Sequence, residues 1–299
     1  MRNTSLCKVS IYLITFFLIG ISCSPIQQSE KQQENNIIIV DDEGDGDFTS
    51  VLDAVMHAAN GDIIKVYSGT YEGRITITHQ IFLKGINQEF ESGFDSGKPV
   101  LTSSEDIGTL ILVEADGCEI SGFLINPGIP EGDEYGNNGV ALHSKDNIVS
   151  NNVLHIGNRG ILAYIGKDTA DCSNNFINNN SLSGFSVAIQ IEGHECQVIN
   201  NEIFENNFGI HIFDANDVSV LKNNFKNNYL DAFVFWIPFS YNIYYPRPEN
   251  VRFDGNFYDN WIYSFPKPIL RGFAPLLIPI IFSLTYDLHP VKEPYDIII

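Results

Sequence analysis

One pattern of apolar and polar positions recurs between Ile120 and Tyr258: an apolar residue, two further residues, Asn, one residue and a second apolar residue. Its copies are Ile148–Val153, Ile177–Leu182, Val198–Ile203, Val220–Phe225 and Phe253–Tyr258. The copies at Ile177, Val198 and Val220 start 21 and 22 residues apart (198 − 177 and 220 − 198). A fixed period of roughly 20–50 residues indicates a solenoid, in which each repeat stacks on the next.

Each repeat continues with two more apolar positions. After the second apolar residue, six residues pass before an apolar-x-apolar triplet, so that Leu182 leads to Ile189 and Ile191, and Ile203 leads to Ile210 and Ile212. A turn of this length holds three short strands and no helix, and alternate residues of each strand face inward. The pattern therefore predicts an all-β coil in which like positions of successive turns stack into one core.

The stacking predicts three inward columns. They are Ile120/Ile148/Ile177/Val198/Val220/Phe253, Ile125/Val153/Leu182/Ile203/Phe225/Tyr258 and Val140/Ile161/Ile189/Ile210/Ala232. Asn suits the corner between strands because it tolerates left-handed backbone angles, and its amide can bond to the Asn above and below. We therefore interpret the repeated asparagines as structural: Asn151, Asn180, Asn201, Asn223 and Asn256.

A solenoid needs a cap at each end, because an open end exposes core and unpaired strand edges. After a first strand at Ile37–Val40, residues 48–59 have helical spacing, with Ser50 and Asp53 as a capping box. This helix is the expected N-terminal cap. After Trp261 the repeat stops and prolines accumulate, which predicts a C-terminal cap over residues 263–299, with the coil itself spanning 37–262.

The first 23 residues have the pattern of an export signal. Arg2 and Lys8 precede an apolar stretch at 11–21 that is too short to span a bilayer. Small residues and Cys23 follow, which resembles a bacterial lipoprotein box with Gly20 in place of the usual aliphatic residue. Two outcomes stay open, a lipid anchor on Cys23 or cleavage near Ser22 to Ser24. The polar residues 24–36 then form a tether.

Charge and cysteine content exclude some classes of partner. The formal net charge is −20, which argues against nucleic acid, because affinity for phosphate backbones comes from Lys and Arg. It also disfavours a polyanionic polysaccharide unless a cation bridges the two. Beyond the leader, Cys118, Cys172 and Cys196 are odd in number and lack zinc-like spacing. We interpret them as small buried apolar residues.

Two segments carry a family resemblance. Residues 44–55 (GDGDFTSVLDAV) and then Gly69-Thr-Tyr71 resemble the opening turns of pectin methylesterases, and the Asn-rich repeats resemble NosD-type and carbohydrate-binding/sugar-hydrolase repeats. The resemblance implies a single-stranded right-handed parallel β-helix of the pectin lyase-like superfold over roughly residues 37–260. It says little about function, because this superfold hosts many activities.

The catalytic motifs of these relatives do not occur in the sequence. Pectin methylesterase motifs of the kind QDT, DFIFG and GRPW are missing, and Gly193-His194-Glu195 is the nearest approach to the Gly-His-Gly of polygalacturonases. Pectate lyases use calcium-binding acids with a basic residue, and the repeats hold Arg159 and few other cations. No family site therefore transfers residue by residue.

Stacking nevertheless brings polar residues of neighbouring turns together. Glu192, His211 and Asp214 are candidates for acid–base chemistry, with Gln190 beside them, since glycoside hydrolysis needs two carboxylates within about 5–10 Å. Aromatic residues follow in the next repeat and in the insertion after it. They suit stacking on sugar rings, and the candidate ligand-binding residues are Gln190, Phe233, Phe235, Trp236, Tyr241 and Tyr244.

A calcium site is the one cofactor that the sequence suggests. Asp41, Glu43 and Asp45 with Gly46 resemble the start of a calcium loop, but Leu52 stands where an EF-hand has its Glu. A solvated acidic turn is the alternative. The seven His residues are scattered and give no copper site.

Three functions remain after this reading. The first is an exported cell-surface protein that interacts with a polysaccharide or glycan and has no recognisable catalytic motif. The second is a polysaccharide lyase or glycoside hydrolase with a non-standard site. The third is a structural surface module or adhesin. We expect contact with a membrane only through an anchor at Cys23, and the sequence does not indicate the oligomeric state.

Overall fold

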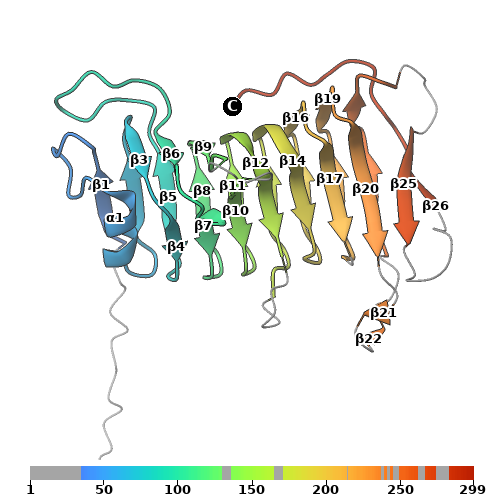
Figure 1. Cartoon of the computed structure of the whole chain (residues 1–299), viewed down its shortest axis with the longest axis horizontal. Helices are drawn as coiled ribbons and strands as arrows, with labels where there is room; N and C mark the ends of the chain where they lie inside the picture. The colour runs from blue at the N-terminus through green and yellow to red at the C-terminus, as the bar shows by residue number, and fades with distance from the viewer. Residues whose placement is uncertain are drawn as a thin grey trace, which may run out of the picture. The chain divides into compact units, whose positions relative to one another are not determined.

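The computed structural model describes residues 35–129, 136–164, 171–213, 215–236, 239–240, 243–244, 249–261, 267–273 and 283–299. Residues 35–299 form one unit made almost wholly of stacked parallel strands, and Figure 1 shows these strands side by side in chain order. They stack in three ladders, so the predicted coil of parallel strands is confirmed.

The first ladder runs through β1 (Ile37–Val40), β2 (Ile63–Val66), β5 (Phe82–Gly85), β8 (Glu119–Ser121), β11 (Ile148–Ser150), β13 (Phe176–Asn178), β15 (Gln197–Ile199), β18 (Ser219–Leu221), β23 (Arg252–Asp254) and β26 (Ser283–Asp287). The second runs through β3 (Thr70–Glu72), β6 (Val100–Thr102), β9 (Leu124–Asn126), the start of β12 (Val153–Ala163), the start of β14 (Ser181–Ile191), β16 (Glu202–Phe204), β19 (Asn224–Lys226) and β24 (Phe257–Tyr258).

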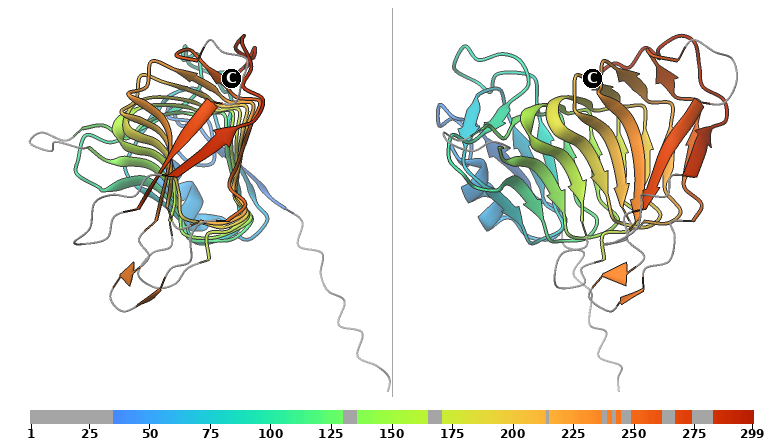
Figure 2. Two further views of the ribbon diagram at one scale, coloured as in Figure 1. Left: turned by 90° about the vertical axis from the view of Figure 1, so that its right-hand side faces the viewer. Right: turned by 45° about the vertical axis from the view of Figure 1, so that its right-hand side comes forward.

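The third ladder consists of β4 (Ile75–Ile77), β7 (Thr109–Val113), β10 (Asn138–Leu142), the ends of β12 and β14, β17 (Phe208–Phe213), β20 (Leu230–Trp236) and β25 (Lys267–Phe273). β26 also pairs antiparallel with β25, which closes the coil at its C-terminal end. A short antiparallel pair, β21 (Phe239–Ser240) and β22 (Ile243–Tyr244), stands apart from the ladders. Figure 2 shows the turns superposed along the axis of the coil.

The core consists of apolar columns that run along the coil. In the first ladder, each of eight successive inward side chains is at most 1% exposed: Ile64, Leu83, Ile120, Val149, Ile177, Val198, Val220 and Phe253. Full burial of such a side chain contributes about 1.5–3 kcal/mol, and no single turn could enclose it. The third predicted column, Val140 to Ala232, is confirmed by its pairing and burial.

The first repeat departs from the predicted register by one residue. Val149 and Leu154 face the core, whereas Ile148 is 39% exposed and pairs with Phe176. The prediction of Ile148 and Val153 as inward residues was therefore wrong. A shift of one residue exchanges the two faces of a strand, and adjacent apolar residues in this repeat concealed the shift.

Buried asparagines form a hydrogen-bonded ladder at the corner between the first and second ladders of strands. Each side-chain oxygen accepts from the backbone N–H and the side-chain amide of the preceding member, at 2.8–3.2 Å, in the order Asn152, Asn180, Asn201, Asn223, Asn256. The structural role is confirmed for four predicted residues, but Asn152 takes the place given to Asn151.

Of the two reasons given for asparagine at these corners, the amide hydrogen bonds between stacked asparagines are confirmed, whereas the left-handed backbone angle was wrong. The laddered residues do not have positive φ; the residue before each of them does, at Asn151, Asn179, Asn200, Lys222 and Gly255, with φ between 55° and 66°. Asparagine is needed for its amide, which supplies both a donor and an acceptor in the buried corner.

The N-terminal end carries the predicted helix, α1 (Val51–His57). Ser50 is its N-cap and its hydroxyl accepts from the backbone N–H of Asp53 at 3.3 Å, as a capping box requires. The helix buries Val51, Ala54 and Val55 against β1, β2 and β4. It is shorter than the predicted 48–59, because Phe48 bridges to Val40 and Ala58 has extended angles.

The C-terminal residues return along the coil. After β26 the chain passes back over earlier turns (Figure 1), where Tyr295 exchanges backbone hydrogen bonds with the Asn224 side chain and Asn179 donates to the carbonyl of Ile298. Cys118, Cys172 and Cys196 are buried, as predicted, and none of these three forms a disulfide bond. No helix in the described part of the chain is long and apolar enough to cross a membrane.

Candidate functional site

The outward side of the third ladder brings together residues from three successive turns. Gln190, His211 and Phe233 pair in register on β14, β17 and β20. Their neighbours in the strands, such as Ile210 and Ile212, are fully buried, and successive side chains of a strand point to opposite faces. The three residues therefore lie on one outward surface, which we call the third-ladder face.

An aromatic cluster surrounds the imidazole of His211. The ring stacks with Phe233 at 5.7 Å and with Phe208 at 6.4 Å between centroids, with interplanar angles of 27° and 29°. Phe213 and Phe235 complete the cluster at 6.2 and 6.1 Å and stack on each other at 5.4 Å. Aromatic pairs contribute about 0.5–1.5 kcal/mol each beyond their buried area, so the cluster is an ordered surface.

A polar row borders this cluster on the preceding turns. The Arg159 Nε donates to Gln190 Oε1 at 2.7 Å, and Gln190 Nε2 donates to Glu192 Oε1 at 2.6 Å. The glutamine thus connects a guanidinium to a carboxylate, and hydrogen bonds fix both the oxygen and the nitrogen of its side-chain amide. Hydrogen bonds to charged groups are about twice as strong as neutral ones, so this row presents donors and acceptors in a fixed order beside the rings.

The environment of His211 keeps its imidazole neutral. Burial among the rings lowers the pKa of His211 to about 4, and the nearby Arg159 charge adds to the effect. Its Nε2 is buried and has no hydrogen-bond partner among the described residues. A neutral imidazole has one donor and one acceptor nitrogen, and an unpaired buried polar atom costs about 1–3 kcal/mol. The site therefore contains an unused polar group between aromatic surfaces.

The face continues toward the N-terminus as an apolar strip. Leu112, Ala141 and Leu162 occupy the same outward column, are 2–8% exposed and pack with Tyr164. His143 lies beside Tyr164, with the ring centroids 5.8 Å apart, and burial lowers its pKa. The third-ladder face thus changes from apolar to polar to aromatic along the coil.

Five sequence candidates have described side chains and lie together on this face with Phe213: Gln190, Glu192, His211, Phe233 and Phe235. Asp214 and Tyr241 lie outside the described residues, as do the side chains of Trp236 and Tyr244. Cys23 lies outside them as well. The candidate residues chosen from the sequence did not include Arg159, Phe208 and Phe213. The one signal for the two phenylalanines was their position close to His211 in the sequence.

The spacing of carboxylates on the face bears on its chemistry. Among the described residues of the outward column that contains Glu192, the next carboxylate is Glu114, with His143 and Tyr164 on the turns between. Three turns of about 4.8 Å each separate Glu192 from Glu114 in this column, a distance of roughly 14 Å. A pair of glycosidic carboxylates lies about 5–10 Å apart, so Glu192 and Glu114 do not form one.

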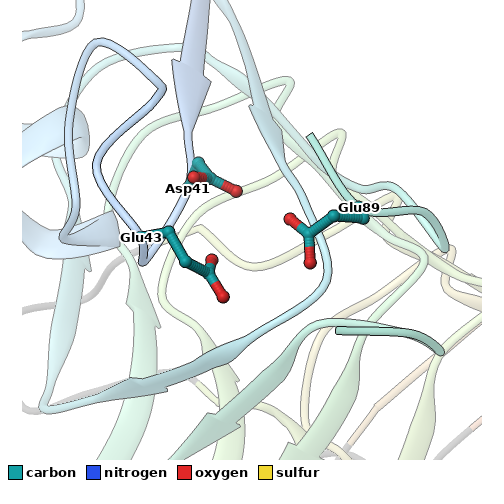
Figure 3. A group of neighbouring side chains, drawn as sticks. All are labelled: Asp41, Glu43 and Glu89. Carbon is teal, nitrogen blue, oxygen red and sulfur yellow. The ribbon is translucent and has the colours of Figure 1, made fainter. Parts of the chain in front are cut away.

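A second group of polar residues lies near the N-terminal end of the coil. Oxygens of Asp41, Glu43 and Glu89, which Figure 3 shows, lie within 4.8 Å of one another. The same holds for oxygens of Asp42, Glu43 and Asp95. Asp45, the third predicted calcium candidate, belongs to neither group; its carboxylate accepts from the backbone N–H of Ser92 at 3.2 Å. Glu89 and Asp95 come from a loop that the sequence did not connect with this turn.

Comparison with known proteins places the architecture. The family described as "Right handed beta helix region" matches residues 100–260, more than half of the chain. YbhC of Escherichia coli has a similar structure, with a TM-score of 0.52 at 11% identity, covering 77% of this chain and 74% of that one. The pectin methyl esterase of the rice weevil gives 0.50 at 9% identity, covering 70% and 74%.

A third structure is much longer than this chain. The tailspike protein gp49 of the Acinetobacter baumannii bacteriophage Fri1, a capsular polysaccharide depolymerase, gives a TM-score of 0.42 at 11% identity. The match covers 68% of this chain and 46% of the tailspike. At such identities the likeness concerns the fold alone.

The sequence matches none of the curated proteins with which it was compared. The NosD-type character of the repeats stays a prediction. The fold, the ladders and the family match agree, and the chain belongs to the right-handed β-helix family, with a coil of the pectin lyase-like type.

Proposed function

We propose that the protein binds a polysaccharide or glycan on the third-ladder face. The observation that carries this proposal is the aromatic cluster, in which the imidazole of His211 is stacked between Phe208 and Phe233 beside the polar row that contains Gln190. A sugar ring has an apolar face that packs on aromatic rings and hydroxyls that can donate or accept, so it can contact the rings and the polar row together.

The polar row gives the ligand a direction. A sugar that stacks on the aromatic cluster brings its hydroxyls to the turn before it, where Arg159, Gln190 and Glu192 lie in a fixed hydrogen-bonded order. Sites of this kind combine apolar surface with a few placed polar groups that set orientation and specificity. Because the chain carries a net charge of −20, a neutral saccharide suits the face better than a polyanionic one.

The arrangement supports binding more strongly than cleavage. Hydrolysis by two carboxylates needs a second acid near Glu192, and among the described residues of its column the next acid, Glu114, is too distant. The rice weevil protein of like fold is a pectin methyl esterase by name, which supports a polysaccharide as partner but, at 9% identity, transfers no reaction.

We extend the proposal to location. The apolar leader and Cys23 support export, with the protein at the cell surface or released from it. A glycan-binding coil would meet its ligand there.

A glycan microarray of the intact chain tests the proposal. We expect selective binding to a limited set of neutral glycans, with a loss of at least tenfold in Phe233→Ala and in Gln190→Ala. Phe94→Ala is the matched control, since that ring is fully exposed on the loop between β5 and β6, near the N-terminal end of the coil. Binding to no glycan, or equal binding by all variants, would contradict the proposed function.

A further inference from the structure

Two loops from different turns meet near the N-terminal end of the coil. The loop between β1 and α1 contributes Asp41, Asp42 and Glu43, and the loop between β5 and β6 contributes Glu89 and Asp95. The second loop is shaped around the Glu89 carboxylate, whose oxygens accept the backbone N–H groups of Phe90 at 2.9 Å and Asp95 at 2.6 Å. The contact between Asp45 and Ser92 joins the two loops beside the cluster.

The cluster concentrates negative charge without compensation. Among the described residues, no Lys, Arg or His forms an ion pair with Asp41, Asp42, Glu43, Glu89 or Asp95. Carboxylates this close repel one another, and one of them raises the proton affinity of the next. Unlike the surface acids elsewhere, these five come from two loops that are held together, so the repulsion opposes the observed packing.

Asp41 is the residue that distinguishes this cluster from an ordinary acidic surface. It is 0% exposed. Its Oδ2 accepts from the backbone N–H of Asp45 at 3.3 Å, whereas its Oδ1 has no hydrogen-bond partner in the described part of the chain. Figure 3 shows its carboxylate turned toward the space that Glu43 and Glu89 border. A buried carboxylate oxygen without a partner is costly unless a cation or donor meets it.

A glycine permits the close approach of the second loop. Gly93 has φ of +130°, and a Cβ there would lie 2.8 Å from Glu89 Oε2 and 3.1 Å from Glu43 Oε1. A side chain at this position would therefore enter the space between the two carboxylates, in addition to straining the backbone. The loop leaves that space to the oxygens.

We propose that Asp41, Glu43 and Glu89 bind one Ca²⁺ ion that joins the β1–α1 loop to the β5–β6 loop, with Asp42 and Asp95 adding ligands or charge at its side. Calcium takes six to eight oxygens at about 2.3–2.6 Å in adaptable geometry. Two oxygens on one such ion lie at most about 5 Å apart, which fits groups whose oxygens are within 4.8 Å. Mg²⁺ demands shorter bonds and a stricter octahedron.

The ion would stabilise the N-terminal cap. Binding to the folded state alone shifts the folding equilibrium toward that state, and the two loops that it joins flank α1 and the first turns. This site is distant in the coil from the third-ladder face around β14, β17 and β20, so the proposed calcium binding does not depend on the proposed saccharide binding.

Metal titration of the intact chain tests the proposal. After treatment with EDTA and dialysis, we expect saturable binding of Ca²⁺ by calorimetry with one strong site and a rise of several degrees in Tm that EGTA reverses. Tb³⁺ should bind in the same place and luminesce on excitation of Tyr71, whose pKa is raised by burial and by the charges of Asp42, Asp41 and Glu43.

Matched variants separate the site from general acidity. Glu43→Gln and Asp41→Asn should each weaken Ca²⁺ binding at least tenfold, whereas Asp116→Asn, at an exposed acid on another turn, should leave it within twofold. Glu43 is exposed, so Glu43→Gln keeps the fold even if Asp41→Asn does not. The proposal is overturned by no calcium-dependent rise in Tm, by an equal response to Mg²⁺, or by unchanged binding in Glu43→Gln.

Discussion

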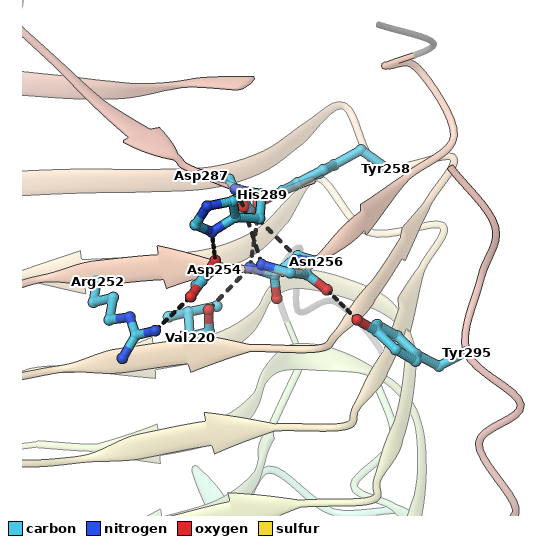
Figure 4. Close-up of polar contacts among 9 residues, drawn as sticks. Val220, Arg252, Asp254, Asn256, Tyr258, Asp287, His289 and Tyr295 are labelled. Carbon is cyan, nitrogen blue, oxygen red and sulfur yellow. Dashed lines mark hydrogen bonds and ion pairs between the residues drawn. The ribbon is translucent and has the colours of Figure 1, made fainter. Parts of the chain in front are cut away.

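Asp287 Oδ2 accepts both the backbone N–H and the side-chain amide of Asn256, at 3.0 and 2.8 Å (Figure 4). On each earlier turn from Asn180 to Asn256 an asparagine oxygen receives the same two donors from the asparagine before it. Asp287 also accepts from the hydroxyl of Tyr258 at 3.2 Å. A carboxylate accepts hydrogen bonds and has none to donate. Asp287 therefore ends the series, in which each asparagine amide would otherwise need another acceptor on the next turn.

Removal of this terminal acceptor should loosen the last turns first. In Asp287→Ala the two donors of Asn256 stay buried without an acceptor, at a cost of about 3 kcal/mol. Repeat arrays can lose cooperativity, so we expect faster amide hydrogen exchange at β23 and β24, together with a lower Tm. Asp296→Ala, at an exposed residue of the tail, is the control. Equal protection of β23 and β24 in both variants would refute the role of Asp287.

A buried ion pair holds β25 to the coil. Lys267 Nζ lies 2.6 Å from Asp231 Oδ2 and 3.9 Å from the centroid of the Tyr258 ring, and the two side chains of the pair are 11% and 4% exposed. Lys267→Met keeps the length of the side chain but leaves the Asp231 carboxylate unpaired, which should cost about 3–5 kcal/mol. Chemical denaturation measures this. Adding Asp231→Asn should recover part of the loss; a double variant no more stable than Lys267→Met would show that the pair is not coupled.

The low pKa of His211 makes stability depend on pH. Because the folded pKa is about 4 and the usual value about 6.5, the stabilisation is complete above pH 6.5 and is lost as pH falls toward 4. Between pH 7 and 5 the loss is roughly 2 kcal/mol. Arg159 and Glu192 are the charged groups of the polar row beside the ring. His211→Phe should remove this part of the pH dependence, measured as the difference between variant and wild-type unfolding curves at the two pH values.

Calcium affinity at the proposed site should rise with pH. A hydrogen bond with the Asp42 carboxyl raises the pKa of Glu43 to about 7, and the proton must leave when the ion binds. The acids around it are Asp41, Asp42, Glu89 and Asp95, with Tyr71 nearby. Affinity at pH 8 should therefore be about tenfold higher than at pH 6. Calorimetry in two buffers of different ionisation enthalpy would show the released proton. A pH-independent affinity would exclude Glu43 as a ligand.

The sequence predicted the fold because the coil repeats a local pattern. Each copy of the pattern states which residues face inward, and in the copies from Ile177 onward only one register places an asparagine at the required spacing between two apolar residues. At Asn151 and Asn152 two adjacent asparagines satisfied the pattern almost equally well. Only the pairing of Val149 with Ile120 and Ile177 decides the register.

The candidate site was predicted in part for the same reason. Gln190 and His211 occupy equivalent positions of adjacent repeats, so their proximity follows from the period. Arg159 precedes an insertion and reaches Gln190 only through its side-chain conformation. Likewise Glu89 meets Asp41 through the packing of two irregular loops, and neither loop contains a period from which the contact could be inferred.

The most direct test of the proposed function follows the imidazole of His211 by NMR while a glycan is added. The glycan is the strongest array ligand, and His211→Phe assigns the resonance. We predict that the ring signals of His211 shift in a saturable manner, with the same affinity as the intact chain shows on the array. Saturable binding that leaves these signals unchanged would contradict the account, since the glycan would then lie away from the third-ladder face.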